Sequence, residues 1–308
     1  MCTLFTRIGA SRRPFLASTS DDPYPVQNQV VGAGTQPYAY LAVRVVNNRE
    51  EDLPWGNMLT RGINAAGLAY TYAFVWEPEV DYRPSQDWVP AMLATCTTVA
   101  EATEHMRQHA DTLLSGNYLV ADRTGVVSAI EVANATVAPR RARGRIVVCA
   151  NRWEHHKMHA AGDWGAETAA ARFDRACALL TKDGDGMESL VRVLRDHGDQ
   201  GCDAGRNYGT AICNHGRQQG TISAELLDTG RAWLWWAHGW PCGHRRGYEL
   251  STRTPWGRFI AFAVDRLEGE SLRAITTLDG AITSAGIRVI ADIERRPKTD
   301  ALDTRSVS

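Results

Sequence analysis

The order of the apolar patterns predicts an α+β fold, a layered sandwich in which two β-sheets face each other and helices lie outside. Alternating apolar residues, which indicate strands, dominate residues 2–75 and return at residues 118–150 and after residue 207. Two pairs of segments with apolar residues at helical spacing lie between them, within residues 88–106 and 167–197. This order favours one layered domain over residues 1–295, because the chain shows no low-complexity linker and no repeat. Residues 296–308 are polar and are expected to form a flexible tail.

The first elements are strands. Residues 2–8 alternate well enough for a strand, the turn residues Gly9 and Pro14 follow, and residues 15–19 can pair back as the second strand of a hairpin. This hairpin would bring residues 18–22 close to Cys2. Three more strands are expected in the first third of the chain, over residues 38–46, 58–64 and 67–75.

Helices and further strands follow. Met92, Leu93, Val99 and Met106 recur at helical spacing, and Thr98 is a plausible N-cap for the second of two helices. A second helical pair is expected at residues 167–180 and 187–197. The remaining strands are expected at residues 118–121, 126–132, 145–150, 207–224, 232–237 and 259–263.

Composition excludes several classes of protein. The chain has 308 residues, is 44% hydrophobic and 22% charged, and carries a formal net charge of -1, which is typical of a soluble globular protein. Nothing in this balance argues for nucleic acid, and the basic segment 140–145 has no interleaved aromatic residues. The N-terminus lacks the features of a signal peptide, and no apolar run reaches the length of a spanning helix. We therefore expect a cytoplasmic protein with a small-molecule partner and with no nucleic-acid or membrane partner. A homo-oligomer is one of the oligomeric states that the sequence allows.

Cys2 is the most informative residue. Removal of Met1 would leave a cysteine with a thiol and a free α-amine at the start of a strand, so that nucleophile and base belong to one residue. The seven cysteines are odd in number and contain no CxxC pair, which argues against a disulfide framework or a zinc ribbon. We expect most of them to be buried thiols, with Cys2 as the exception.

Five short motifs occur in a suggestive order: the opening MCT, GINAAGLA, VPAMLATCTTVAEATEHM, NYLVADRTGVVSAIEV and VVCANRW. In this order they resemble the N-terminal-nucleophile (Ntn) cysteine amidases of the choloylglycine hydrolase and penicillin V acylase family, with the related isopenicillin N acyltransferases. The resemblance covers residues 1 to about 180, and the later GTISAELLD and WWAHGWPC are similar to the acyltransferase branch. It implies a four-layer αββα Ntn-hydrolase sandwich.

The resemblance also implies roles for particular residues. Asp21, with Asp22 as the alternative, would orient the amine and thiol of Cys2 by charge-assisted hydrogen bonds. Asn151 would donate a hydrogen bond to the oxyanion, and a second donor would be a backbone N–H near Phe74. Arg172 would be a charge partner of the nucleophile.

Alternatives and one departure remain. Arg175 could take the part of Arg172. Ser18 stands where the bile-salt and penicillin amidases carry an arginine, which is expected to subtract a charge from the site and argues against copying their substrate. The residues expected to bind substrate are Ser18, Tyr24, Tyr72, Phe74 and Trp76.

No metal and no cofactor are predicted. His155 and His159 are one helical turn apart, but HEXXH is absent and the neighbouring Lys157 disfavours a cation. His238, Cys242 and His244 lack a partner at helical or zinc-knuckle spacing. Five tryptophans between Trp233 and Trp256 are expected in the core, with an apolar pocket wall or a dimer surface as the alternative.

These observations predict a cysteine amidohydrolase that cleaves a linear carbon–nitrogen amide bond of a small N-acylated molecule through an acyl-enzyme on Cys2. The first alternative is an acyltransferase that moves an acyl group from a thioester or amide donor to an amine. Two further alternatives are an inactive binding protein that keeps the fold and a zinc hydrolase.

Overall fold

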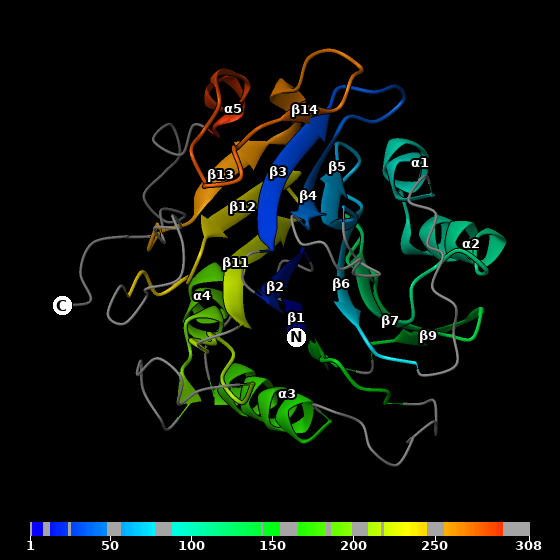
Figure 1. Ribbon diagram of the computed structural model, residues 1–308. Helices are drawn as coiled ribbons and strands as arrows, with labels where there is room; N and C mark the ends of the chain where they lie inside the picture. The colour runs from blue at the N-terminus through cyan, green and yellow to red at the C-terminus, as the bar shows by residue number, and fades with distance from the viewer. Residues whose placement is uncertain are drawn as a thin grey trace.

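The computed structural model describes residues 2–8, 13–23, 26–47, 57–77, 88–142, 144–154, 166–182, 186–198, 209–216, 219–244 and 256–291. These residues form two antiparallel β-sheets with helices on their outer faces (Figure 1). The predicted sandwich of two facing sheets is therefore confirmed. The expected tail at residues 296–308 lies outside the described residues.

The smaller sheet has six strands and carries the N-terminus. Its spatial order is β10, β1, β2, β11, β12, β13. The predicted hairpin of β1 and β2 is confirmed, since Leu4 lies opposite Ser18. The strands are β1 (Leu4–Ile8), β2 (Pro14–Pro23), β10 (Ile146–Cys149), β11 (Gln219–Asp228), β12 (Trp233–His238) and β13 (Ile260–Ala263).

The larger sheet has eight strands in the order β14, then β3 to β9 in sequence. Most neighbours are consecutive along the chain, because short turns join antiparallel strands. The strands are β3 (Gln27–Ala33), β4 (Tyr40–Val46), β5 (Leu59–Asn64), β6 (Ala69–Phe74), β7 (Gly116–Ala121), β8 (Val127–Ala133), β9 (Thr136–Arg141) and β14 (Arg273–Ala274).

Helices cover the outer face of each sheet. The pair α1 and α2 lies beside β5 to β7, whereas α3 and α4 lie on the opposite side near β1, β2 and β11 (Figure 1). Thr98 caps α2 as predicted, in a capping box with Glu101. The helices are α1 (Trp88–Thr95), α2 (Val99–Gln108), α3 (Ala166–Lys182), α4 (Met187–Leu194) and α5 (Ser284–Val289), and a 3-10 turn, η2 (Val264–Arg266), follows β13. No helix in the described part of the chain is long and apolar enough to cross a membrane.

Three apolar layers separate these elements. The layer between the sheets contains Cys2, Leu4 and Leu41, the layer under α1 and α2 contains Tyr72 and Trp88, and the layer under α3 and α4 contains Phe5 and Leu180. Neighbouring residues of β1 thus face different layers, because side chains alternate along a strand. The four-layer αββα arrangement follows directly. The late tryptophans are core residues, as Trp233 and Trp235 lie in the layer under α3 and α4 and Trp236 lies between the sheets.

Three parts of the strand prediction were wrong. Strands β3 and β9 were missed: β3 opens with the polar Gln27, Asn28 and Gln29, while β9 contains Pro139, which is tolerated because β9 lies at a sheet edge. The strand expected at residues 207–224 begins only at Gln219. Before it the chain reverses direction, with Thr221 N–H donating to the carbonyl of Asn214 at 2.9 Å.

Candidate active site

Cys2 lies directly before β1, with its side chain in the layer between the two sheets. Its main-chain N–H donates to Asn151 Oδ1 at 2.5 Å, and its Sγ lies 3.3 Å from Arg61 Nη2. The hairpin brings β2 alongside, with Thr19 N–H donating to the carbonyl of Thr3 at 3.0 Å. Cys2 is only 9% exposed, so the expectation that it would be the exception among buried thiols was wrong. The facing sheet covers it.

Arg61 brings to Cys2 a positive charge that was not expected from the serine at position 18. It projects from β5 of the larger sheet, is 1% exposed, and donates through Nη2 to both Cys2 Sγ and the carbonyl of Thr19. Its Nη1 donates to Thr60 Oγ1 at 2.6 Å. A guanidinium next to a thiol favours the thiolate. The arginine absent at Ser18 is therefore replaced by one that approaches the thiol from the opposite sheet.

A buried carboxylate balances Arg61. Glu225 on β11 lies 3.4 Å from Arg61 Nε and accepts hydrogen bonds from Ser18 Oγ at 2.7 Å and from Ser223 Oγ at 2.5 Å. Asn28 extends this network by donating to Ser223 Oγ at 2.8 Å. Burial raises the pKa of Glu225, and the charge of Arg61 opposes that rise. Ser18 is fully buried in this network and contacts the ion pair, rather than lining an open surface.

Asp21 and Asp22 lie in different surroundings, and this distinguishes the two alternatives. Asp21 Oδ1 accepts a hydrogen bond from Thr221 Oγ1 at 2.6 Å. Burial raises the pKa of Asp21 to about 6, while the charges of the N-terminus and of Arg172 act to lower it. Asp22 accepts a hydrogen bond from Ser20 Oγ at 3.4 Å, and its charge acts on Arg61 and Glu225 as well as on Asp21. Asp21 thus belongs to the group around the main-chain nitrogen of Cys2, and Asp22 to the group around the thiol.

Arg172 on α3 reaches the amine side of Cys2. It is fully buried, and it donates to Asn151 Oδ1 at 2.9 Å and to Thr3 Oγ1 at 3.2 Å. It also donates to the carbonyl of Gly209. Arg175 points elsewhere, in an ion pair with Asp196 at 2.9 Å. Arg172 is therefore the arginine of α3 that the structure brings to Cys2.

Asn151 is held at the end of β10 with its side chain fixed on both sides. Its Oδ1 accepts from Cys2 N–H and from Arg172, and its Nδ2 donates to the carbonyl of Phe74 at 2.6 Å. Asn117 supports this turn by donating to the carbonyls of Ala150 and Arg152 at 2.7 and 2.8 Å. One of the two Nδ2 hydrogens is thereby used. The second has no partner among the described residues.

The residues expected to bind substrate separate into different places. Tyr72 lies in the layer under α1 and α2, where its hydroxyl donates to the carbonyl of Ser115 at 2.9 Å, so it faces away from Cys2. Phe74 contacts the site through its carbonyl, which accepts the hydrogen bond from Asn151 Nδ2, and a backbone N–H near Phe74 as the second oxyanion donor stays a prediction. Its ring stands edge-on to Trp76, which is 58% exposed, at a centroid distance of 6.1 Å. Tyr24 lies outside the described residues.

Sequence reasoning missed three site residues: Arg61, Thr221 and Glu225. Arg61 and Glu225 carried a usable signal, because each is the one charged residue in the interior of its strand. Thr221 carried none. Its role depends on the pairing of β11 with β2, which sets Thr221 opposite Asp21.

The fold and this site define a class of protein. Two facing antiparallel sheets between helical layers, with a cysteine at the start of a strand and its nitrogen and sulfur separately hydrogen-bonded, are features of Ntn amidohydrolases and acyltransferases of the choloylglycine hydrolase type. The structure is similar to penicillin V acylase from Agrobacterium tumefaciens, with a TM-score of 0.56 and 16% identity over 89% of this chain and 91% of that chain. A mutant of conjugated bile acid hydrolase from Clostridium perfringens gives a TM-score of 0.58 and 10% identity, covering 92% of this chain and 99% of that chain. At such identities the likeness establishes the Ntn-hydrolase fold.

The family follows from the sequence. Residues 51–214, more than half of the chain, match the model of the acyl-coenzyme A:6-aminopenicillanic acid acyl-transferase family. The chain belongs to this family, which confirms the resemblance seen in the motifs. A comparison with curated protein sequences finds no match.

Proposed function

We propose that this protein is an N-terminal cysteine amidohydrolase that cleaves a linear amide of a small N-acylated molecule, with Cys2 as nucleophile after removal of Met1. The observation that carries the proposal is the double anchoring of Cys2, by its nitrogen to Asn151 and by its sulfur to Arg61. A free amine at this position would lie next to its own thiol and could take the thiol proton. The nucleophile and the base would then need no distant histidine.

The reaction can be written with these groups. The α-amine of Cys2 accepts the thiol proton, and the thiolate, stabilised by Arg61, attacks the carbonyl carbon of the amide. The second Nδ2 hydrogen of Asn151 donates to the oxyanion that forms. When the tetrahedral intermediate collapses, the carbon–nitrogen bond breaks and the α-ammonium protonates the leaving amine. The acyl group remains on Cys2 as a thioester.

Arg172 and Asp21 position the amine rather than react. Arg172 shares Asn151 Oδ1 with the nitrogen of Cys2 and so fixes the orientation of that amide. Burial raises the pKa of Asp21 to about 6, so near neutral pH its carboxylate is mostly ionised and can attract the ammonium form of the α-amine.

The second candidate is acyl transfer, and the family match favours it. In that reaction an amine, rather than water, attacks the thioester on Cys2. The family is described by an acyl-coenzyme A donor and a 6-aminopenicillanic acid acceptor. Whether water or an amine attacks the thioester depends on how far the site excludes water. An inactive binding protein loses its main support, because that alternative rested on the missing charge at Ser18 and Arg61 supplies such a charge.

Intact mass spectrometry with an electrophilic thiol reagent tests the nucleophile. We expect the wild type to lack the mass of Met1 and to label rapidly at one site, and Cys2→Ala to lose that labelling. Cys177→Ala is the matched control, because Cys177 is the partly exposed thiol of α3 and should not contribute. Retention of Met1, or labelling that persists in Cys2→Ala, would refute the mechanism.

A second experiment separates hydrolysis from transfer. Penicillin V, a conjugated bile acid and an acyl-coenzyme A are the first donors to test, each with and without added 6-aminopenicillanic acid. Free acid as the product in both conditions supports hydrolysis. An N-acylated acceptor that forms at the expense of the free acid supports transfer.

A further inference from the structure

Four side chains with metal-binding atoms lie close together outside the candidate active site. They are His197, Cys213, His215 and Cys242, and their ligand atoms all lie within 4.8 Å of one another. They come from three separate segments: the chain after α4, the turn before β11, and the turn after β12. The sequence hides this group, because only Cys213 and His215 are close along the chain. Cys242 has no partner at helical or zinc-knuckle spacing, but the fold brings it to His197, Cys213 and His215.

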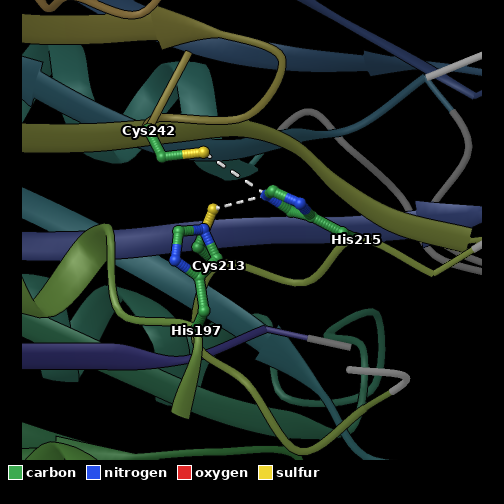
Figure 2. Close-up of side chains that lie close together, drawn as sticks. All are labelled: His197, Cys213, His215 and Cys242. Carbon is green, nitrogen blue, oxygen red and sulfur yellow. Dashed lines mark hydrogen bonds between the residues drawn. The ribbon is translucent and has the colours of Figure 1, made fainter. Parts of the chain in front are cut away.

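Two of the separations between the ligand atoms are close to those of a tetrahedral site. Figure 2 shows both sulfur atoms directed at the same edge of the His215 ring, with the ring of His197 next to Cys213. His215 Nε2 lies 3.3 Å from Cys213 Sγ and 3.4 Å from Cys242 Sγ. A tetrahedral zinc ion with Zn–S of about 2.3 Å and Zn–N of about 2.0 Å requires S···N separations of roughly 3.5 Å and an S···S separation of roughly 3.8 Å. The two S···N separations at His215 therefore already agree with a tetrahedral zinc site.

The surroundings hold these side chains in position. His215 is fully buried, and its ring stacks on Trp240 at 3.7 Å with an interplanar angle of 8°. Cys213 N–H donates to the carbonyl of Asp196 at 2.8 Å, which ties it to the residue before His197. His244 N–H lies 3.4 Å from Cys242 Sγ, as an amide that donates to a metal-bound thiolate would. Packing and hydrogen bonds thus prepare the ligands before any ion binds.

We propose that His197, Cys213, His215 and Cys242 bind one zinc ion in a structural site. Two thiolates and two imidazoles in a tetrahedral arrangement are the ligand set that Zn²⁺ prefers. On binding, each cysteine thiol loses one proton to solvent and forms a Zn–S bond, while the neutral histidines each form a Zn–N bond. Four protein ligands leave no open coordination position, so the ion would not activate water. The ion would therefore take no chemical part in the reaction proposed for Cys2.

This zinc site would brace the active site through a short path. Asn214, between the ligands Cys213 and His215, donates its N–H to Thr221 Oγ1 at 2.9 Å. Thr221 in turn donates to Asp21 at 2.6 Å. An ion that joins the ends of α4 and β12 to this turn would therefore hold Thr221 against Asp21.

Metal analysis of the purified full-length protein tests the proposal. We expect roughly one zinc per chain after dialysis against a chelator, and an X-ray absorption spectrum with two sulfur and two nitrogen neighbours at about 2.3 and 2.0–2.1 Å. The double variant Cys213→Ser/Cys242→Ser should bind at least tenfold less zinc. Cys96→Ser is the matched control, since Cys96 is a buried thiol in the other helical layer and should leave the zinc content unchanged.

Other results would overturn the proposal. These are wild-type protein free of metal after growth with added zinc, zinc retained by the double variant, or a zinc spectrum without sulfur neighbours. A mass lower by two hydrogens, from a Cys213–Cys242 disulfide, would also exclude it. If the double variant does not fold, the metal content and absorption spectrum of the wild type decide the question alone.

Discussion

Arg61 gives the sharpest test of the site, because it acts on both the thiol and the core. Substitution by Met removes a guanidinium that lies 3.3 Å from Cys2 Sγ and 3.4 Å from Glu225. At an effective dielectric constant of about 20, a charge pair at the first distance attracts by about 5 kcal/mol. Glu225 neutralises part of this attraction. We therefore expect Arg61→Met to slow alkylation of Cys2 at least tenfold, equivalent to about 1.4 kcal/mol.

The same substitution leaves Glu225 buried without its counter-ion. Breaking a buried ion pair from one side costs about 3–5 kcal/mol, so the free energy of unfolding in urea should fall by that amount. The double variant Arg61→Met/Glu225→Gln removes the uncompensated charge and should recover part of the loss, while alkylation stays slow. Arg175→Met is the control, since it breaks the partly exposed pair with Asp196 and should cost about 1 kcal/mol or less.

The two effects of Arg61 can be separated experimentally. Alkylation is measured under conditions in which each variant is fully folded, and Arg61→Lys keeps a positive charge at the position. Alkylation of Arg61→Met at the wild-type rate would refute the argument that Arg61 stabilises the thiolate. An unchanged urea midpoint would refute the argument that it balances Glu225.

Three further predictions concern other parts of the site and the fold. The pKa of Asp21 is about 6 in the folded protein against 3.8 as its ordinary value, so the folded state binds its proton more tightly; the resulting stability is present below pH 3.8 and is lost as the pH rises through 6. Urea unfolding at pH 4 and pH 7 should therefore show a loss roughly 2–3 kcal/mol larger in the wild type than in Asp21→Asn, and equal losses would contradict the assignment. Asn151→Ala should reduce the rate of acyl-enzyme formation by about 10²–10³-fold, measured by time-resolved intact mass with any donor found active, and a rate within threefold of wild type would exclude Asn151 as an oxyanion donor. Thr98→Ala should lower the free energy of unfolding by about 0.5–2 kcal/mol through loss of the α2 cap while leaving Cys2 labelling unchanged, and a change in labelling would mean that α2 is coupled to the site.

Much of the fold was predictable because its signals are local. The hairpin of β1 and β2, the capped helix α2 and the helices α3 and α4 each follow from periodicity, turn residues or a cap within a few residues. The errors occurred where local patterns are weak. Strand β3 begins with polar residues, and it forms because it pairs with β4. Strand β9 contains a proline, and as an edge strand it pairs with β8 alone.

The charges of the site were less predictable. Cys2, Asp21, Asn151 and Arg172 were inferred from the N-terminal cysteine and from the family motifs, and the structure brings all four together. Ser18 led to the expectation of one charge fewer at the site, and Arg61 supplies a positive charge that this expectation did not include. Position 18 lies on β2, but the arginine comes from β5 in the other sheet, and no local pattern links the two strands.

By itself, the sequence predicted a layered α+β protein and placed at the start of a hairpin the cysteine that removal of Met1 would leave with a free α-amine beside its thiol. Only the tertiary structure decided which charges meet that cysteine, that Tyr72 faces away from it, and that Cys213, His215, Cys242 and His197 converge. The physical reason is the distance along the chain over which each effect acts. Backbone propensity and side-chain alternation act over a few residues. The contact between Cys2 and Arg61 and the convergence of these four side chains depend instead on how separate strands and turns pack across the core.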